Sequence, residues 1–210
     1  MEYLTPDEMK AAEAAAGSRG LGTERLMENA GRAIAGAIDD RYAQLRGGRI
    51  LVVCGTGNKG GDGMVVARYL RDGWSVLVIL LGGPTLIKTK EALRNWTRIE
   101  DLVISVKDAE DLKAHKRYFQ RADIIVDAML GTGMHGEVRE PLATAVQMVN
   151  AARAAKVSVD IPSGLDPLTG EPSAQVVRAD ITVTLHRAKL GMRGRDEYTG
   201  EVVVADIGID

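Results

Sequence analysis

From Arg49 onward, apolar runs of strand length alternate with segments of helical character, and this alternation limits the folds that the chain can adopt. The apolar runs are rich in β-branched residues and lie at 50–54, 75–81, 102–106, 123–130, 157–160, 181–185 and 202–207. Continuous runs of this kind are typical of strands that are covered on both faces, as in a parallel sheet. Between them we expect helices over 64–71, 89–98, 110–120 and 141–155. The pattern predicts right-handed βαβ crossovers and therefore an α/β fold with a doubly wound sheet.

Two further helices are expected before the first strand. Thr5 has the hydroxyl group of an N-cap, Pro6 stands at the first helical position, and Glu8 has capping-box spacing from Thr5. This start predicts a helix that runs to about Ala16. A second helix is expected from about Thr23, because small and aliphatic residues between 26 and 38 recur with a helical period.

Length, charge and composition narrow the classes of function. The 210 residues fit a single α/β domain over 1–210. A formal net charge of −2 with both signs mixed, and only 4% aromatic residues, argue against a nucleic-acid partner. No apolar run is long enough to cross a bilayer, so no membrane partner is expected. Cys54 is the single cysteine and cannot form an internal disulfide. We therefore expect a cytoplasmic protein with a small-molecule partner.

The stretch GTGNKGGDG, at 55–63, follows the first apolar run. Its glycines allow positive φ and a close approach of ligand to backbone, and the N–H groups at the start of the next helix, expected at Met64, favour anions. A phosphate or pyrophosphate is the predicted ligand. The stretch does not end in the Gly-Lys-Ser/Thr of a P-loop, and the next strand does not end in the acid that holds a ribose. A standard nicotinamide dehydrogenase is therefore the weaker interpretation.

Two other expected strands end in acids. Asp127 precedes a second glycine turn at 131–137, and Asp160 is followed three residues later by Ser163. In the simpler interpretation Asp127 only caps a turn or accepts backbone N–H bonds. Because the carboxyl ends of parallel strands meet at one edge of a sheet, these ends and the glycine stretch predict a ligand site in one crevice. Lys189 could reach the same crevice, but a solvated lysine is the favoured interpretation.

Three motifs together give a more specific indication. GTGNKGGDG, VDAMLGTG and VDIPSGLD, in this order, resemble the patterns of the NAD(P)H-hydrate epimerases, also called the YjeF N-terminal domain family. Supporting matches are LMENAG at 26–31, VREP at 138–141 and TVTLHRAKLG at 182–191. The resemblance covers nearly the whole chain.

The resemblance implies a Rossmann-like three-layer αβα sandwich, usually dimeric, that interconverts the R and S epimers of hydrated NADH and NADPH during nicotinamide nucleotide repair. It implies that the substrate site is lined by Asn58, Lys59, Gly60, Gly61, Asp62, Gly131, Thr132, Gly133, Met134, His135, Gly136 and Glu137, and that Asp160 contacts the substrate. The resemblance also places a potassium ion at Lys59, Asp127 and Ser163. The ending EVVVADIGID matches the point where many members continue into a dehydratase domain. No dehydratase domain is expected within 1–210, so the resemblance implies either a free-standing epimerase or one half of a fused enzyme. A dehydratase domain or protein is then the expected partner.

Lys59 departs from the family pattern, which has asparagine there. In one hypothesis its ammonium group replaces the potassium ion and pairs with Asp127; in the other its stem turns outward to solvent or a substrate phosphate while potassium still binds. For the acid that transfers the proton, Asp160 is the first candidate and Asp127 the second. The alternative function is a non-catalytic nucleotide-binding or scaffold module of the same fold.

Overall fold

The computed structural model describes residues 2–133 and 137–209. Within these residues, seven strands form a sheet in the order β4-β3-β2-β5-β6-β7-β9, and each neighbouring pair is parallel. The strands are β2 (Arg49–Cys54), β3 (Ser75–Leu81), β4 (Val103–Val106), β5 (Ile124–Ala128), β6 (Ala155–Val159), β7 (Ile181–Leu185) and β9 (Glu201–Ala205). The predicted α/β fold with a mostly parallel sheet is confirmed.

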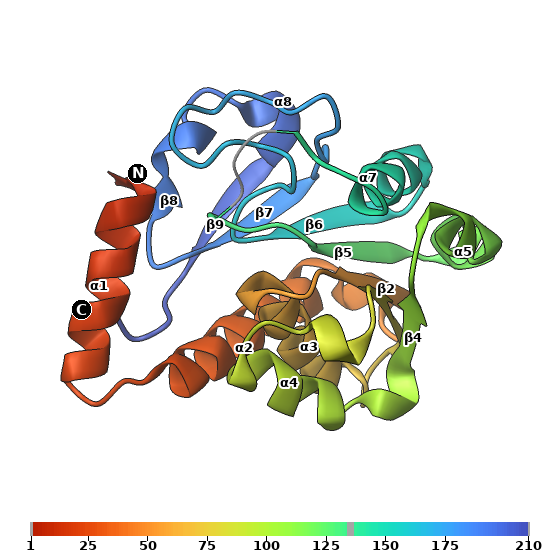
Figure 1. Cartoon of the computed structure of the whole chain (residues 1–210), viewed down its shortest axis with the longest axis horizontal. Helices are drawn as coiled ribbons and strands as arrows, with labels where there is room; N and C mark the ends of the chain where they lie inside the picture. Colours follow the sequence, from red (N-terminus) through yellow and green to blue (C-terminus); the bar gives the residue numbers. More distant parts are fainter. Residues whose placement is uncertain (1, 134–136, 210) are drawn as a thin grey trace.

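Helices cover both faces of the sheet. They are α1 (Pro6–Ser18), α2 (Thr23–Arg41), α3 (Asn58–Leu70), α4 (Lys90–Thr97), α5 (Ala109–Ala114), α6 (Lys116–Arg121), α7 (Leu142–Ala151) and the short α8 (Asp196–Thr199). The helices α2, α3 and α4 lie on one side of the sheet and α7 on the other (Figure 1). Alternate residues of β2 serve the two layers: Val52 packs in the core under α2 and α3, whereas Val53 packs in the core under α5, α6 and α7. The three-layer αβα sandwich is therefore confirmed.

The strand order places a topological switch between β2 and β5. From β2 the chain moves outward through β3 to β4, and then returns to the other side of β2 as β5. In the register of the sheet Val53 pairs with Asp127, and Asp127 pairs with Ser158. Ligands of doubly wound sheets bind at the carboxyl ends of the strands beside such a switch. The ends of β2, β5 and β6 meet at this point.

Three helix boundaries differ from the sequence predictions. The helix expected from Met64 already begins at Asn58. The single helix expected over 110–120 is two helices, because the N–H of His115 closes α5 on the carbonyl oxygens of Leu112 and Lys113 and α6 starts afresh. The helix expected over 141–155 ends at Ala151, and its last expected residue is the first residue of β6.

The N-terminal segment pairs with a short strand outside the seven-stranded sheet. Thr5 and Glu8 form the predicted capping box of α1, and α2 begins at Thr23 as predicted. The two-residue strand β1 (Tyr3–Leu4) pairs in parallel with β8 (Ala188–Lys189). Across 2–133 and 137–209, no helix combines the length and the apolar character that crossing a membrane requires.

Candidate functional site

A cavity of about 490 Å³ opens at the carboxyl ends of β2, β3 and β5. It is lined by Glu13, Gly55, Thr56, Gly57, Asn58, Lys59, Asp62, Leu81, Lys88, Thr89, Met129, Leu130, Gly131, Thr132, Gly133, Leu142, Asp160 and Leu185. The cavity lies at the topological switch, where the sequence predicts the site. Its volume is within the range of small-molecule sites.

The glycine stretch forms the start of α3 instead of an open loop. None of the glycines between 55 and 63 uses the positive φ that glycine allows. The glycines are needed for close packing. A Cβ on Gly60 would lie 1.9 Å from the carbonyl oxygen of Gly55, and a Cβ on Gly63 would lie 2.4 Å from the Cβ of Ala128. Glycine at these positions lets α3 lie directly against the ends of β2 and β5.

The first turn of α3 provides unused backbone donors. Gly57 is the N-cap and supplies no side-chain hydrogen bond. The N–H of Gly61 bonds to the oxygen of Gly57 at 3.1 Å, so the N–H groups before Gly61 are not used by the helix. Because Gly57 and Asn58 line the cavity, this helix start can receive an anionic group.

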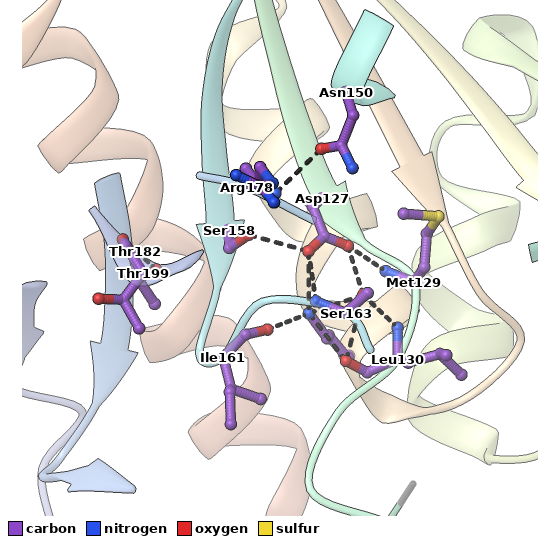
Figure 2. A network of polar contacts seen from close by, with 11 residues as sticks. Asp127, Met129, Leu130, Asn150, Ser158, Ile161, Ser163, Arg178, Thr182 and Thr199 are labelled. Atoms are coloured by element: carbon purple, nitrogen blue, oxygen red, sulfur yellow. Dashed lines mark hydrogen bonds and ion pairs between the residues drawn. The ribbon is translucent and has the colours of Figure 1, made fainter. Parts of the chain in front are cut away.

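Asp127 lies on β5 and is 1% exposed. Its Oδ1 accepts hydrogen bonds from Ser163 Oγ at 2.5 Å and from Met129 N at 3.2 Å (Figure 2). Its Oδ2 accepts from Ser158 Oγ at 2.9 Å and from Ser163 N at 2.8 Å. These four donors use the lone pairs of an ionised carboxylate and leave none for a substrate proton. Asp127 therefore holds the loop after β6 against β5. This is close to the simpler interpretation of the sequence, in which Asp127 caps a turn or accepts backbone N–H bonds.

Lys59 lies in the first turn of α3, is 6% exposed and points toward Asp127. Its Nζ donates to Leu130 O at 2.8 Å, to Ile161 O at 2.6 Å and to Ser163 Oγ at 3.1 Å, and it lies 3.5 Å from Asp127 Oδ2. The structure thus brings together the three residues at which the resemblance places potassium. The alternative in which Lys59 turns outward to solvent is not found.

The hydrogen bonds around Ser163 favour the ammonium form of Lys59. Ser163 Oγ donates its one hydrogen to Asp127, at 2.5 Å, and accepts from Leu130 N at 2.8 Å. It must therefore also accept from Lys59, whose two other partners are carbonyl oxygens that only accept. Three donated bonds suit the ammonium form, and Ser163 Oγ also lies 3.3 Å from Leu130 O. Burial shifts the pKa of Lys59 below its usual value, and the charges of Asp127 and Asp160 counteract that shift.

Potassium does not fit beside this ammonium group. Converging carbonyl, hydroxyl and carboxylate oxygens suit a monovalent cation, but Lys59 already brings one positive charge and three donors to them. A second cation within about 4 Å would meet a repulsion of roughly 4 kcal/mol at an effective dielectric constant of about 20. In the part of the chain that the structure describes, no group of three or more His, Cys, Asp or Glu side chains could hold a metal ion.

Asp160 follows β6 directly and has φ 65°, a left-handed conformation that is uncommon outside glycine. Its Oδ1 accepts from Leu185 N at 3.0 Å, from Thr184 Oγ1 at 3.3 Å and from Lys189 Nζ. Its Oδ2 has no hydrogen-bond partner among residues 2–133 and 137–209. Because Asp160 lines the cavity, one carboxylate oxygen is fixed by the protein and the other is available to a ligand.

Lys189 is 0% exposed, so the favoured interpretation of a solvated lysine is wrong. Besides Asp160, its Nζ donates to Leu185 O at 3.0 Å and to Arg187 O at 3.2 Å. The strand β1 pairs with β8 here, with Leu4 opposite Lys189. A pairing between the first residues of the chain and a segment more than 180 residues away leaves no local pattern in the sequence. A buried lysine is costly unless it is paired, so Lys189 and Asp160 depend on each other.

Two further acids face the cavity near Asp160. Asp62 is buried, and burial together with the negative charges of Asp160 and Glu13 raises its pKa well above the usual value. Partial burial and the charge of Asp160 also raise the pKa of Glu13, which belongs to α1. Both shifts favour a cavity that holds fewer negative charges than its acids would carry in water.

The structure brings most of the predicted substrate-binding residues to the cavity, but not all. Asn58, Lys59, Asp62, Gly131, Thr132, Gly133 and Asp160 line it. Gly60 and Gly61 face inward, where added Cβ atoms would meet Gly55 and Met27. Glu137 accepts a hydrogen bond from Ser173 Oγ at 3.4 Å. Met134, His135 and Gly136 lie outside the described residues.

Some lining residues were not predicted. Lys88 and Thr89 follow β3 at the same edge of the sheet, and Lys88 N donates to Thr56 O at 2.9 Å. Ligands of such sheets bind at the carboxyl ends of strands, and β3 has such an end. The sequence prediction searched strand ends for acids, so it missed Lys88 and Thr89. No sequence signal indicates Glu13, because its place in the cavity depends on how α1 docks.

Comparisons with known proteins agree with this architecture. The family model described as YjeF-related protein N-terminus matches residues 23–191. A protein of Pyrobaculum aerophilum named "Bifunctional NAD(P)H-hydrate repair enzyme Nnr" is 46% identical over 216 residues, which cover 100% of this chain and 42% of that protein. The chain thus spans less than half the length of this relative. A protein of Nitrosopumilus maritimus named "NAD(P)H-hydrate epimerase" is 40% identical, covering 98% of this chain and 95% of that protein.

A solved structure shows the same fold. The crystal structure of yeast ynu0 superposes with a TM-score of 0.79 at 23% sequence identity, covering 95% of this chain and 86% of that chain. At this identity the likeness bears on the fold alone.

Proposed function

The chain belongs to the family of YjeF-related protein N-termini, and from that premise we propose that it interconverts the R and S epimers of hydrated NADH and NADPH. The relatives named NAD(P)H-hydrate epimerase and repair enzyme support this activity. One observation carries the proposal: Asp160 lines a cavity that also contains the uncapped start of α3, and its Oδ2 has no hydrogen-bond partner among residues 2–133 and 137–209. An acid for proton transfer and donors for a pyrophosphate are the two contacts that a hydrated dinucleotide requires.

In the proposed reaction the C–O bond at carbon 6 of the hydrated ring breaks and re-forms. The ring nitrogen supplies electrons to form an iminium-like cation, and the hydroxyl group leaves as hydroxide. Water then adds to the other face of the ring and gives a proton to the ionised Asp160, which passes it to the departed hydroxide. The carboxylate is negatively charged while the cation exists, so it also stabilises that charge. Atoms and charge balance over the cycle, and the enzyme ends unchanged.

Asp127, the second candidate for proton transfer, is less suited to this role. Its four hydrogen bonds are all made within the protein, and it is buried beneath the loop that carries Ser163. Lys189 acts on Asp160 instead of on the substrate, because it holds Oδ1 and leaves Oδ2 without a bond from its own ammonium group. We assign Lys189 as a positioning residue.

The activity is tested by incubating the protein with R-rich hydrated NADH and an S-specific dehydratase, and following the recovery of NADH absorbance. Epimerase activity predicts full recovery, whereas a non-catalytic nucleotide-binding or scaffold module predicts that only the initial S fraction is recovered.

The role of Asp160 is tested with Asp160→Asn, and the exposed Asp72→Asn is the matched control. We expect a loss of about 100- to 10,000-fold in rate for Asp160→Asn and no change for the control. Because Asp160→Asn leaves Lys189 buried without a charge partner, the double variant Asp160→Asn/Lys189→Met is measured as well. A folded Asp160→Asn variant that epimerises at the native rate would exclude this mechanism.

The S epimer is the substrate of a dehydratase in this scheme, so a dehydratase is the proposed partner, either as a separate protein or as a fused domain. Homodimer formation and a cytoplasmic location stay predictions. Light scattering of the purified chain measures the first.

A further inference from the structure

We propose that the ammonium group of Lys59 is a built-in substitute for a monovalent cation, so that the site of this chain is complete without potassium. The inference deepens the proposed function, because it concerns the same cavity. It is tested by a measurement of stability that does not require epimerase activity.

The oxygens around Lys59 Nζ form the kind of cage that a monovalent ion would occupy. Two are backbone carbonyl oxygens, of Leu130 and Ile161, which can only accept. The third is Ser163 Oγ, whose hydrogen is committed to Asp127, and the carboxylate of Asp127 lies just beyond. These groups come from the ends of β5 and β6, and a positive charge among them compensates the negative charge of Asp127.

The sequence provides room for the stem of Lys59 to reach this cage. Lys59 starts on the first turn of α3, and Gly131 lies beside it. A Cβ added to Gly131 would lie 3.4 Å from Lys59 Cβ and 3.7 Å from its Cδ, so the stem runs along a residue that has no side chain. The side-chain stem of Lys59 attaches the positive charge covalently to α3. The occupancy of the cage then does not depend on the potassium concentration.

The test measures the thermal midpoint of unfolding at constant ionic strength while potassium chloride replaces tetramethylammonium chloride. The native chain is compared with Lys59→Asn, which removes the tethered charge and restores the family's residue. The exposed Lys116→Asn removes the same charge elsewhere and is the control. Lys59→Met keeps the length of the stem but brings no charge and gives no room for an ion. Epimerase rates are measured under the same conditions.

We expect no effect of potassium on the native chain or on Lys116→Asn. Lys59→Asn should be less stable without potassium and should gain about 5–10 °C as potassium approaches 100 times its dissociation constant. Lys59→Met should be destabilised without rescue. The proposal is overturned by a saturable rise of the native midpoint with potassium, by a native epimerase rate that requires potassium, or by a folded Lys59→Asn variant that potassium does not stabilise.

If Lys59→Asn and Lys59→Met fail to fold, the titration of the native chain alone still decides, because a cage that binds potassium must respond to it. Failure of the proposed function is distinguishable from failure of this inference. A chain that lacks epimerase activity but has a potassium-independent midpoint contradicts the former and supports the latter.

Discussion

Replacing Gly31 by alanine is predicted to destabilise the protein, although alanine is the better helix former. Gly31 lies within α2 and faces α3. A Cβ at this position would lie 2.4 Å from both Cβ and Cγ1 of Val65 and 3.1 Å from the carbonyl oxygen of Asp62. Ordinary contacts between carbon atoms are about 3.5–4.0 Å, so the two helices would have to separate by about 1 Å. The Cβ of Val65 is fixed by the backbone of α3 and cannot turn away.

The magnitude follows from two opposing effects. Replacing glycine by alanine inside a helix is worth about 0.5–1 kcal/mol, whereas overpacking of this kind costs about 1–3 kcal/mol. At the midpoints of these ranges the net loss in the free energy of unfolding is about 1.2 kcal/mol, or about 2–5 °C in Tm for a domain of this size.

Gly36 is the matched control, because it lies in the same helix, is exposed, and would place its Cβ in open space. We expect Gly36→Ala to raise the free energy of unfolding by about 0.5–1 kcal/mol. Chemical denaturation of both variants measures these differences. The packing argument is refuted if Gly31→Ala is as stable as the native protein, or if both variants change stability in the same direction.

Three further outcomes follow from the site. Asp62 has a raised pKa in the folded protein, so its contribution to stability is complete below its unfolded pKa and is lost as pH rises through its folded pKa. The stability of Asp62→Asn relative to the native chain should therefore increase from about pH 4 to pH 8, as measured by urea denaturation. Ser158→Ala removes one donor to the buried Asp127 and should cost about 1–3 kcal/mol, whereas a loss under 0.5 kcal/mol would show that this hydrogen bond is dispensable. Burial raises the pKa of the Cys54 thiol, so a thiol reagent should label the native chain only as fast as it unfolds; rapid labelling near pH 8 without denaturant would contradict this.

The sheet was predictable because its signal is local. Each strand of the sheet overlaps one of the runs predicted from the sequence, and the parallel order follows from the alternation with helices. The start of α3 was not predictable in the same way, because glycine disfavours a helix by its own propensity. Gly60 and Gly63 are helical because the sheet requires a helix without side chains at those positions.

The residues of the candidate site also differ in whether a local sequence pattern predicts them. Asp127, Asp160 and Ser163 could be found from the sequence, because each stands at or just after the end of an apolar run. Lys189 could not be assigned correctly, since its burial depends on pairing between β8 and the first residues of the chain. Glu13 gave no signal for a related reason, because it reaches the cavity from α1 through tertiary docking.

The short strand β1 has a practical consequence for handling the protein. Leu4 pairs with Lys189, and Glu2 forms an ion pair with Arg187 at 2.7 Å. Lys189 in turn holds Asp160, the proposed catalytic acid. A change at the N-terminus, such as an affinity tag before Met1 or a deletion of the first five residues, therefore acts on Asp160 through the Leu4–Lys189 and Lys189–Asp160 contacts. Expression of the chain for assay is therefore best designed with the tag at the other terminus, and an inactive N-terminal fusion should be cleaved before its inactivity is interpreted.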